Sequence, residues 1–102
     1  MKNLKQTLID EPKNQMEEIE KKIEESDKET ELLEAKLKVE KKMLEMRDLP
    51  EGIAEDVKYS VQALEGMLQM EKNSNAEFKK EFEILRYRSQ VIRKFDDMEL
   101  LN

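Results

Sequence analysis

The chain has 102 residues, of which 43% are charged and 37% hydrophobic, and its formal net charge is −6. With two glycines and two prolines it lacks the turn-forming residues that sheets and phosphate-binding loops need. Because cysteine and histidine are absent, disulfide frameworks, thiol or histidine catalysis and the usual zinc sites are excluded. We therefore expect a small all-α protein that is not an enzyme and has no metal, cofactor or small-molecule substrate.

The N-terminal residues contain no apolar stretch of the length found in signal or membrane segments. We expect a short N-terminal segment over residues 1–11, a cytoplasmic location and no membrane contact. Pro12 follows acidic residues, and proline is tolerated in the first turn of a helix. A long helix is therefore predicted from about Pro12 to about Arg47.

A tight turn is predicted at residues 48–52, where Pro50 and Gly52 lie close together. A second helical stretch follows and extends to about Met98. Residues 12–102 are thus expected to form a single helical hairpin domain.

Two serines carry the pattern of a helix capping box, because Ser26 and Ser74 each precede a glutamate by three residues. Around Ser26 the neighbours are strong helix formers, which favours one continuous first helix. The run of poor helix formers at residues 73–75 makes a kink or break near residue 74 as reasonable as continuity.

Each predicted helix carries a row of apolar or small residues at alternating steps of three and four, the heptad pattern of a coiled coil. The first row comprises Met16, Ile19, Ile23, Ser26, Thr30, Leu33 and Leu37. The second row comprises Val57, Val61, Leu64, Leu68, Glu71, Asn75, Phe78, Phe82, Leu85, Ser89 and Ile92. Polar residues interrupt both rows at equal distances from Pro50, at Ser26 and Ser74. The pattern predicts an antiparallel coiled-coil hairpin in which the numbers of facing residues sum to about 100 or 101.

The distribution of charge is also consistent with a hairpin. The segment from Glu11 to Glu34 is strongly acidic, the segment from Ala76 to Phe95 is basic, and the hairpin places the two side by side. We expect interhelical pairing of the acidic segment with four basic residues, which are Lys79, Lys80, Arg86 and Arg88.

Both helices carry further apolar residues outside these rows, and one partner helix cannot cover both faces. The first of these stripes comprises Leu32, Ala35, Val39, Met43 and Met46, and the second comprises Ile84, Tyr87, Val91, Phe95 and Met98. An intramolecular alternative for the second stripe is that Leu4, Leu8 and Ile9 fold back over it. The residues predicted to bind a partner are Leu32, Val39, Met43, Met46, Tyr87, Val91 and Phe95.

The sequence thus predicts a protein–protein interaction module: an adaptor, an assembly factor or a small inhibitor. Its partner would be a second copy, another protein or both, and would complete a larger helical bundle. Two alternatives stay open. One is a nucleic-acid-associated accessory protein that uses the basic C-terminal helix, and the other is an acidic DNA mimic that inhibits a DNA-binding protein.

Overall fold

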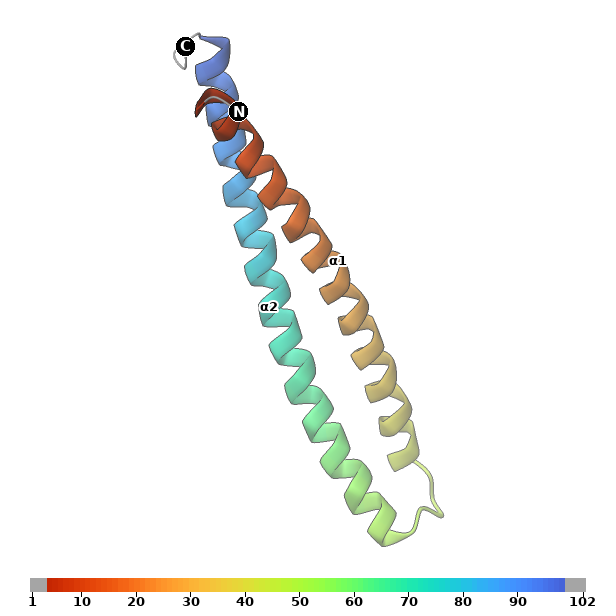
Figure 1. Cartoon of the computed structure of the whole chain (residues 1–102). Helices are drawn as coiled ribbons and strands as arrows, with labels where there is room; N and C mark the ends of the chain where they lie inside the picture. Colours follow the sequence, from red (N-terminus) through yellow and green to blue (C-terminus); the bar gives the residue numbers. More distant parts are fainter. Residues whose placement is uncertain (1–3, 99–102) are drawn as a thin grey trace. The chain divides into compact units, whose positions relative to one another are not determined.

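The fold was obtained as a computed structural model that describes residues 4–98 and contains two helices. Helix α1 comprises Leu4–Leu44 and helix α2 comprises Glu51–Asp97, and residues 45–50 connect them (Figure 1). No strand occurs within the described range. The all-α helical hairpin expected from the heptad pattern is confirmed.

By its internal contacts the chain divides into two compact units. Unit 1 consists of Met1–Glu24 and Ala76–Asn102, and unit 2 consists of Glu25–Asn75. The division falls beside the polar residues that interrupt both heptad rows. Neither helix ends there, so α1 is continuous at Ser26, as expected, and α2 has no break near residue 74.

Helix α1 begins well before the predicted position, since it already includes Leu4, and Pro12 lies buried inside it. The predicted start at Pro12 is therefore wrong; residues 4–11 are helical, and residues 1–3 of the expected N-terminal segment lie outside the described part. Proline has no N–H to donate to the carbonyl of Leu8, which normally disfavours a helix interior. Packing against α2 opposes this penalty in unit 1: Ile9 is half-buried, and Lys5 Nζ lies 2.7 Å from Asp96 Oδ1.

The connection between the helices is short and hydrogen-bonded at both ends. The N–H groups of Glu45 and Met46 donate to the carbonyls of Lys42 and Met43, at 3.1 and 3.2 Å. Such three-residue bonds tighten the last turn of a helix and satisfy carbonyls that would otherwise lack partners. The carbonyl of Pro50 accepts the N–H of Ala54 at 2.9 Å, so this proline lies at the N-terminal boundary of α2, near the first turn as predicted.

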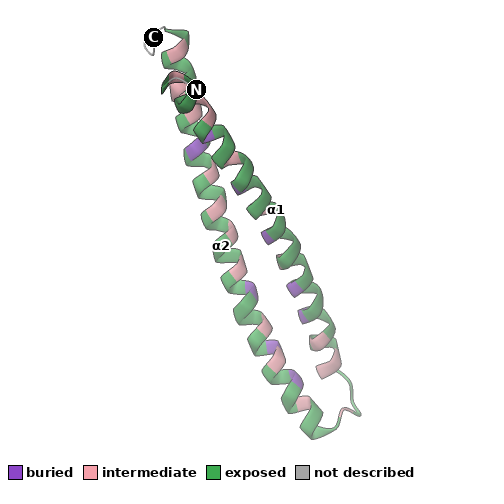
Figure 2. Cartoon of the chain, viewed as in Figure 1, coloured by how far each residue is buried: buried purple, intermediate pink, exposed green. Residues whose placement is uncertain are grey.

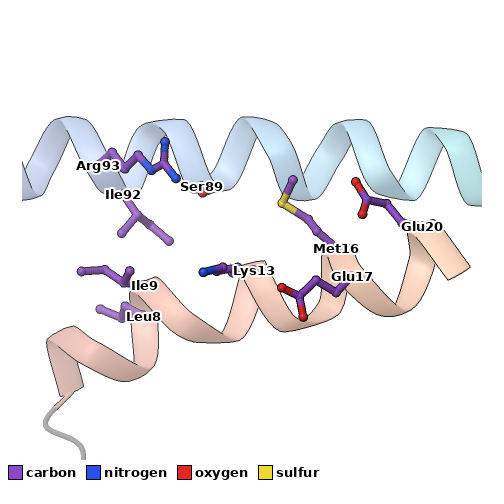
Figure 3. Close-up of a pocket in the computed structure, with 9 residues that line it drawn as sticks. All are labelled: Leu8, Ile9, Lys13, Met16, Glu17, Glu20, Ser89, Ile92 and Arg93. Atoms are coloured by element: carbon purple, nitrogen blue, oxygen red, sulfur yellow. The ribbon is translucent and has the colours of Figure 1, made fainter.

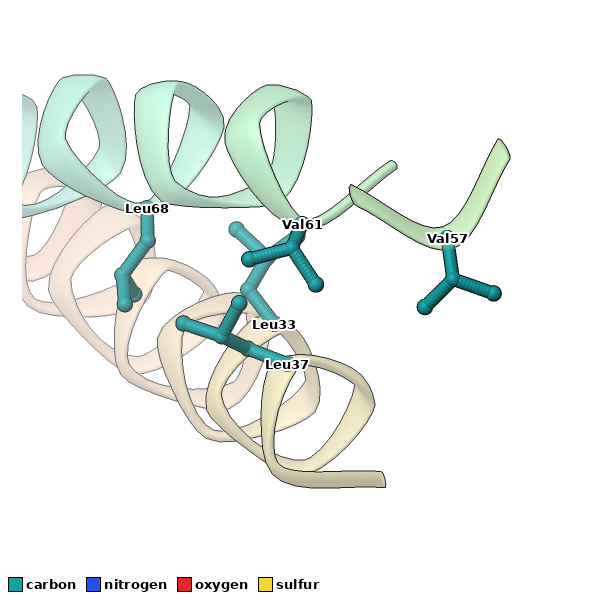
Figure 4. Packing of buried hydrophobic residues seen from close by; sticks show 5 residues of the cluster. All are labelled: Leu33, Leu37, Val57, Val61 and Leu68. Carbon is teal, nitrogen blue, oxygen red and sulfur yellow. The ribbon is translucent and has the colours of Figure 1, made fainter. Parts of the chain in front are cut away.

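The core of unit 2 is a cluster of aliphatic side chains from both helices. It comprises Leu33, Leu37, Val57, Val61 and Leu68, with Met43, Leu44 and Leu64 packed against it. Buried positions lie on the sides of α1 and α2 that face each other within this unit (Figure 2). Leu33, with 3% of its surface exposed, is the most buried member, and Figure 4 shows it with Leu37 between the α2 side chains. The predicted apolar rows therefore form this core.

Polar contacts fix the register in unit 2. Ser60 Oγ donates to both carboxylate oxygens of Glu40, at 2.9 and 2.8 Å, and Asn75 Nδ2 donates to Asp27 Oδ1 at 2.8 Å. The residue numbers of the Ser60–Glu40 pair sum to 100, as predicted, and those of the Asn75–Asp27 pair sum to 102, one beyond the predicted register. Two flanking ion pairs, Lys41–Glu65 at 3.3 Å and Lys72–Glu34 at 3.8 Å, are half-exposed and add little to stability.

Unit 1 buries less. Besides Pro12, the buried apolar residues of unit 1 within the described part are Ile19 and Leu85, each with 8% of its surface exposed. Phe78 is half-buried, and the ammonium of Lys22 lies 5.8 Å from the centre of its ring, within the range of a cation–π contact.

Ser26 introduces a polar group into the interface of unit 2. Only 4% of its surface is exposed, and its Oγ has no hydrogen-bond partner among residues 4–98. Its carbonyl accepts an additional bond from Thr30 Oγ1 at 2.9 Å. A buried hydroxyl without a partner is destabilising, but a polar position in a heptad row fixes the register of a coiled coil.

Replacing Ser26 with alanine should therefore stabilise the protein. Removal of the unpartnered hydroxyl and the higher helix propensity of alanine together predict a gain of about 1 kcal/mol, or a rise in Tm of about 4–8 °C. Thermal unfolding followed by circular dichroism measures the change. The matched control is Ser74→Ala, because Ser74 is exposed on α2 and only the propensity term applies. A lower Tm for Ser26→Ala would mean that this hydroxyl is satisfied in solution.

Candidate functional site

The outer side of α1 in unit 2 carries exposed apolar residues, as the sequence predicts. Leu32, Val39 and Met46 have 48%, 60% and 63% of their surfaces exposed, and Ala35 is exposed between them. Leu32 to Val39 lie on the side of the helix opposite Leu33 and Leu37, and Met46 follows in the connection. We call Leu32, Ala35, Val39 and Met46 the α1 outer face.

Met43 does not belong to this face, although the sequence analysis placed it there. Its side chain is half-buried and packs against the core cluster of unit 2. The physical reason is its place in the last turn of α1, where the flexible thioether side chain can bend toward the cluster and fill space beside it.

The outer side of α2 in unit 2 is a second apolar surface, which the sequence analysis did not assign. Tyr59, Met67 and Met70 have 77%, 52% and 70% of their surfaces exposed, and Ala63 and Gly66 are exposed among them. We call these five residues the α2 outer face. Of the twelve residues from 59 to 70, only Glu65 is charged, in a chain that is 43% charged. This local loss of charge is the sequence signal that identifies the face.

In unit 1 the predicted partner-binding residues of α2 differ in exposure. Tyr87 and Phe95 have 69% and 43% of their surfaces exposed, whereas Val91 is half-buried. The N-terminal residues do not cover these aromatic rings by folding back, because they continue α1, and Leu4 itself is 77% exposed.

A groove of about 280 Å³ lies between the first part of α1 and the last part of α2 in unit 1 (Figure 3). Leu8, Ile9 and Ile92 line one end of the groove. The other lining residues are Lys13, Met16, Glu17, Glu20, Ser89 and Arg93. A second groove of about 330 Å³ on unit 1 is lined by Ile19, Lys22, Ile84 and Arg88, among others. Both grooves are open, and both are lined by apolar and charged side chains.

The basic residues of α2 do not pair with α1 as predicted. Within the part of the chain that the structure describes, Lys79, Lys80, Arg86 and Arg88 form no ion pair with α1; Arg86 instead lies 2.8 Å from Glu83 on its own helix. Long side chains at these positions project from the exposed surface of α2, where hydration competes with pairing. The predicted interhelical pairing of these four residues is therefore wrong.

Among residues 4–98 no group of acidic side chains is arranged to hold a metal ion, and neither helix has an apolar stretch sufficient to cross a bilayer. No known protein family, curated protein or solved structure matches this chain.

Proposed function

We propose that the protein is a non-enzymatic protein–protein interaction module, an adaptor, assembly factor or small inhibitor, whose main binding surface is the α2 outer face. The observation that carries this proposal is the exposure of Tyr59 and Met70 in a stretch with a single charged residue. Contiguous exposed apolar surface of this kind marks an interaction site.

The chemistry of the α2 outer face resembles the centre of a protein interface, where charge is depleted and tyrosine and methionine are enriched. Ala63 and Gly66, in the middle of the face, have a small side chain and none, and the space around Gly66 is open. A partner helix can therefore approach the backbone of α2 closely. Tyr59 and Met70 lie on either side and supply large apolar contacts. We infer that the partner presents an apolar helix face, bound in the helix-in-groove manner.

Nucleic-acid binding has weaker support. Of the aromatic residues interleaved with the basic residues of α2, Phe78 and Phe82 are half-buried, which leaves Tyr87 and Phe95 exposed enough to stack on bases. No observation favours the DNA-mimic alternative, because lysines are interspersed among the acidic residues of α1. Retention on nucleic-acid probes at low salt that falls steeply as salt rises would revive the first alternative.

The proposed function predicts that Tyr59→Glu combined with Met70→Glu abolishes capture of the partner while the hairpin stays folded. Two carboxylates in a desolvated interface are expected to weaken binding by about a hundredfold or more. The measurement is a quantitative comparison of proteins retained by wild type and variant from the native cells, with helicity checked by circular dichroism.

The matched control is Gln62→Glu combined with Gln69→Glu, which adds the same charge to the flank of the α2 outer face, where both glutamines are exposed. Partners lost by the first variant and kept by the control would support the proposal. If every retained protein is kept by both variants, the α2 outer face is not the binding surface.

A further inference from the structure

The α1 outer face differs from the α2 outer face because it is bordered by charge. Its helical apolar residues Leu32, Ala35 and Val39 follow the three-and-four spacing, and Met46 lies beyond the end of α1 in the connection. This is the spacing of a second coiled-coil row, on the side of α1 that α2 does not cover. A helix with two such rows can pack against two neighbours at once.

The charges along this border change sign in the middle of the face. Three acidic residues precede or flank its first half, namely Glu25, Glu29 and Glu31, with Lys28 as the basic residue among them. Three basic residues flank its second half, namely Lys36, Lys38 and Lys42. The three acidic residues and the three basic residues of the second half are all exposed, and none of these six forms an ion pair within residues 4–98. By contrast, Glu34 and Lys41, on the sides of α1 nearer α2, pair with Lys72 and Glu65.

A change of sign within one surface makes that surface complementary to itself when it is turned end for end. In a two-fold pair the same patch meets itself, so each acidic half lies beside the basic half of the other copy. With Leu32 opposite Ala35 of the second copy, Glu29 lies near Lys36 and Glu31 near Lys38. A parallel pair would instead place like charges together at Lys28, Lys42 and Glu25, which is unfavourable.

We propose that two copies of this chain associate through antiparallel packing of their α1 outer faces, which gives a four-helix assembly. The inference deepens the proposed function, and it rests on that function for the view that the outer faces of unit 2 bind helices. Apolar contact between Leu32 of one copy and Ala35 of the other supplies affinity, and the exposed charges select the antiparallel register rather than adding much stability. The α2 outer face stays free in this assembly for a different protein.

The test is the absolute mass of the full chain, measured by light scattering over a wide concentration range. Wild type should be a dimer, and Leu32→Glu combined with Ala35→Glu should weaken association by about a hundredfold or more, with helicity unchanged. Tyr59→Glu combined with Met70→Glu should remain a dimer, so failure of this inference is distinguishable from failure of the proposed function. A monomeric wild type at every concentration would overturn the inference.

Charge reversal tests the border directly. Glu29→Lys with Glu31→Lys makes the residues that flank Leu32 to Val39 basic and leaves Glu25 as the acidic residue of the border. Lys36→Glu with Lys38→Glu makes these flanking residues acidic and leaves Lys28 and Lys42 as the basic residues of the border. Each variant alone should associate less than wild type, and their equimolar mixture should form a mixed dimer. If each variant associates as tightly as wild type, these charges have no role in association.

Orientation is accessible because the chain has no cysteine of its own. Leu32→Cys mixed with Ala35→Cys should give a disulfide-linked dimer under mild oxidation, since these positions face each other in the antiparallel register. Val39→Cys alone should give no disulfide-linked dimer. In the antiparallel register each residue 39 faces residue 28 of the other copy, so the two introduced cysteines lie about 16 Å apart along the helix axis. Efficient linkage through Val39→Cys with none in the mixture would show a parallel pair and refute the proposed arrangement.

Discussion

Truncation of Leu33 to alanine is expected to cost about 2–5 kcal/mol of unfolding free energy, because the side chain fills the centre of the unit 2 core. Leu33 is 3% exposed and lies between the valine and leucine side chains of α2. Small domains have only about 5–15 kcal/mol of stability in total, so this single change should bring the protein close to unfolding at room temperature. Urea unfolding followed by circular dichroism measures the loss.

The adjacent residue provides the control. Leu32→Ala removes the same atoms from the same helix, but Leu32 is 48% exposed on the opposite side. Its effect on the unfolding of the monomer should stay within about 0.5 kcal/mol. Equal losses for the two variants at low protein concentration would mean that the assignment of inner and outer sides of α1 is wrong.

Replacing Pro12 with alanine should stabilise the first turns of α1. Proline inside a helix is about 3 kcal/mol less favourable than alanine, and loss of the buried ring removes part of that gain at about 0.8 kcal/mol per methylene. A net gain of about 1–2 kcal/mol is therefore expected, concentrated in residues 4–12. Amide hydrogen exchange of that segment should slow in the variant, because fewer molecules open locally at any time.

Asn14→Ala is the matched substitution for this experiment, because Asn14 is exposed on the same part of α1 and changes helix propensity alone, by about 0.5 kcal/mol. Exchange in residues 5–11 that is as fast in Pro12→Ala as in wild type would show that the proline does not limit this part of the helix.

Most of the hairpin could be predicted from sequence because the heptad rows and the turn are local, repetitive signals. Every residue of both predicted rows is buried or half-buried, from Met16 in α1 to Ile92 in α2. The register followed from matching polar interruptions about Pro50, and the hydrogen bonds from Ser60 to Glu40, whose residue numbers sum to 100, agree with it. Asn75 rather than Ser74 reaches across, since Ser74 is exposed.

The differences arise where tertiary packing opposes local preference. Pro12 and the run at residues 73–75 are unfavourable for helices, yet both lie inside continuous helices. At Asn75 the hydrogen bond to α1 opposes the low propensity, and near Pro12 the contacts of Ile9 and Lys5 do so. Helix propensity contributes little free energy, and such contacts can exceed it. A single sequence does not show whether propensity or tertiary contact is the larger at a given position.

The candidate surfaces were only partly predictable. Exposure of Leu32 and Val39 followed from their angular position, but the bend of Met43 into the core depends on the end of α1 and is not encoded in helical spacing. Apolar spacing does not predict the α2 outer face, because the heptad pattern of α2 marks the row that faces α1. Counting charges over residues 59–70 would have identified it from the sequence.

The most direct measurement of the central claim is site-specific photo-crosslinking in the native cells. A photoreactive side chain at Met70, within the α2 outer face, is compared with one at Lys72, which lies toward α1 and pairs with Glu34. If the α2 outer face binds a protein, Met70 gives a discrete adduct with one recurrent partner, and Lys72 gives none or far less. The absence of an adduct at both positions, or the same diffuse set at both, would contradict the claim that this surface is a binding site.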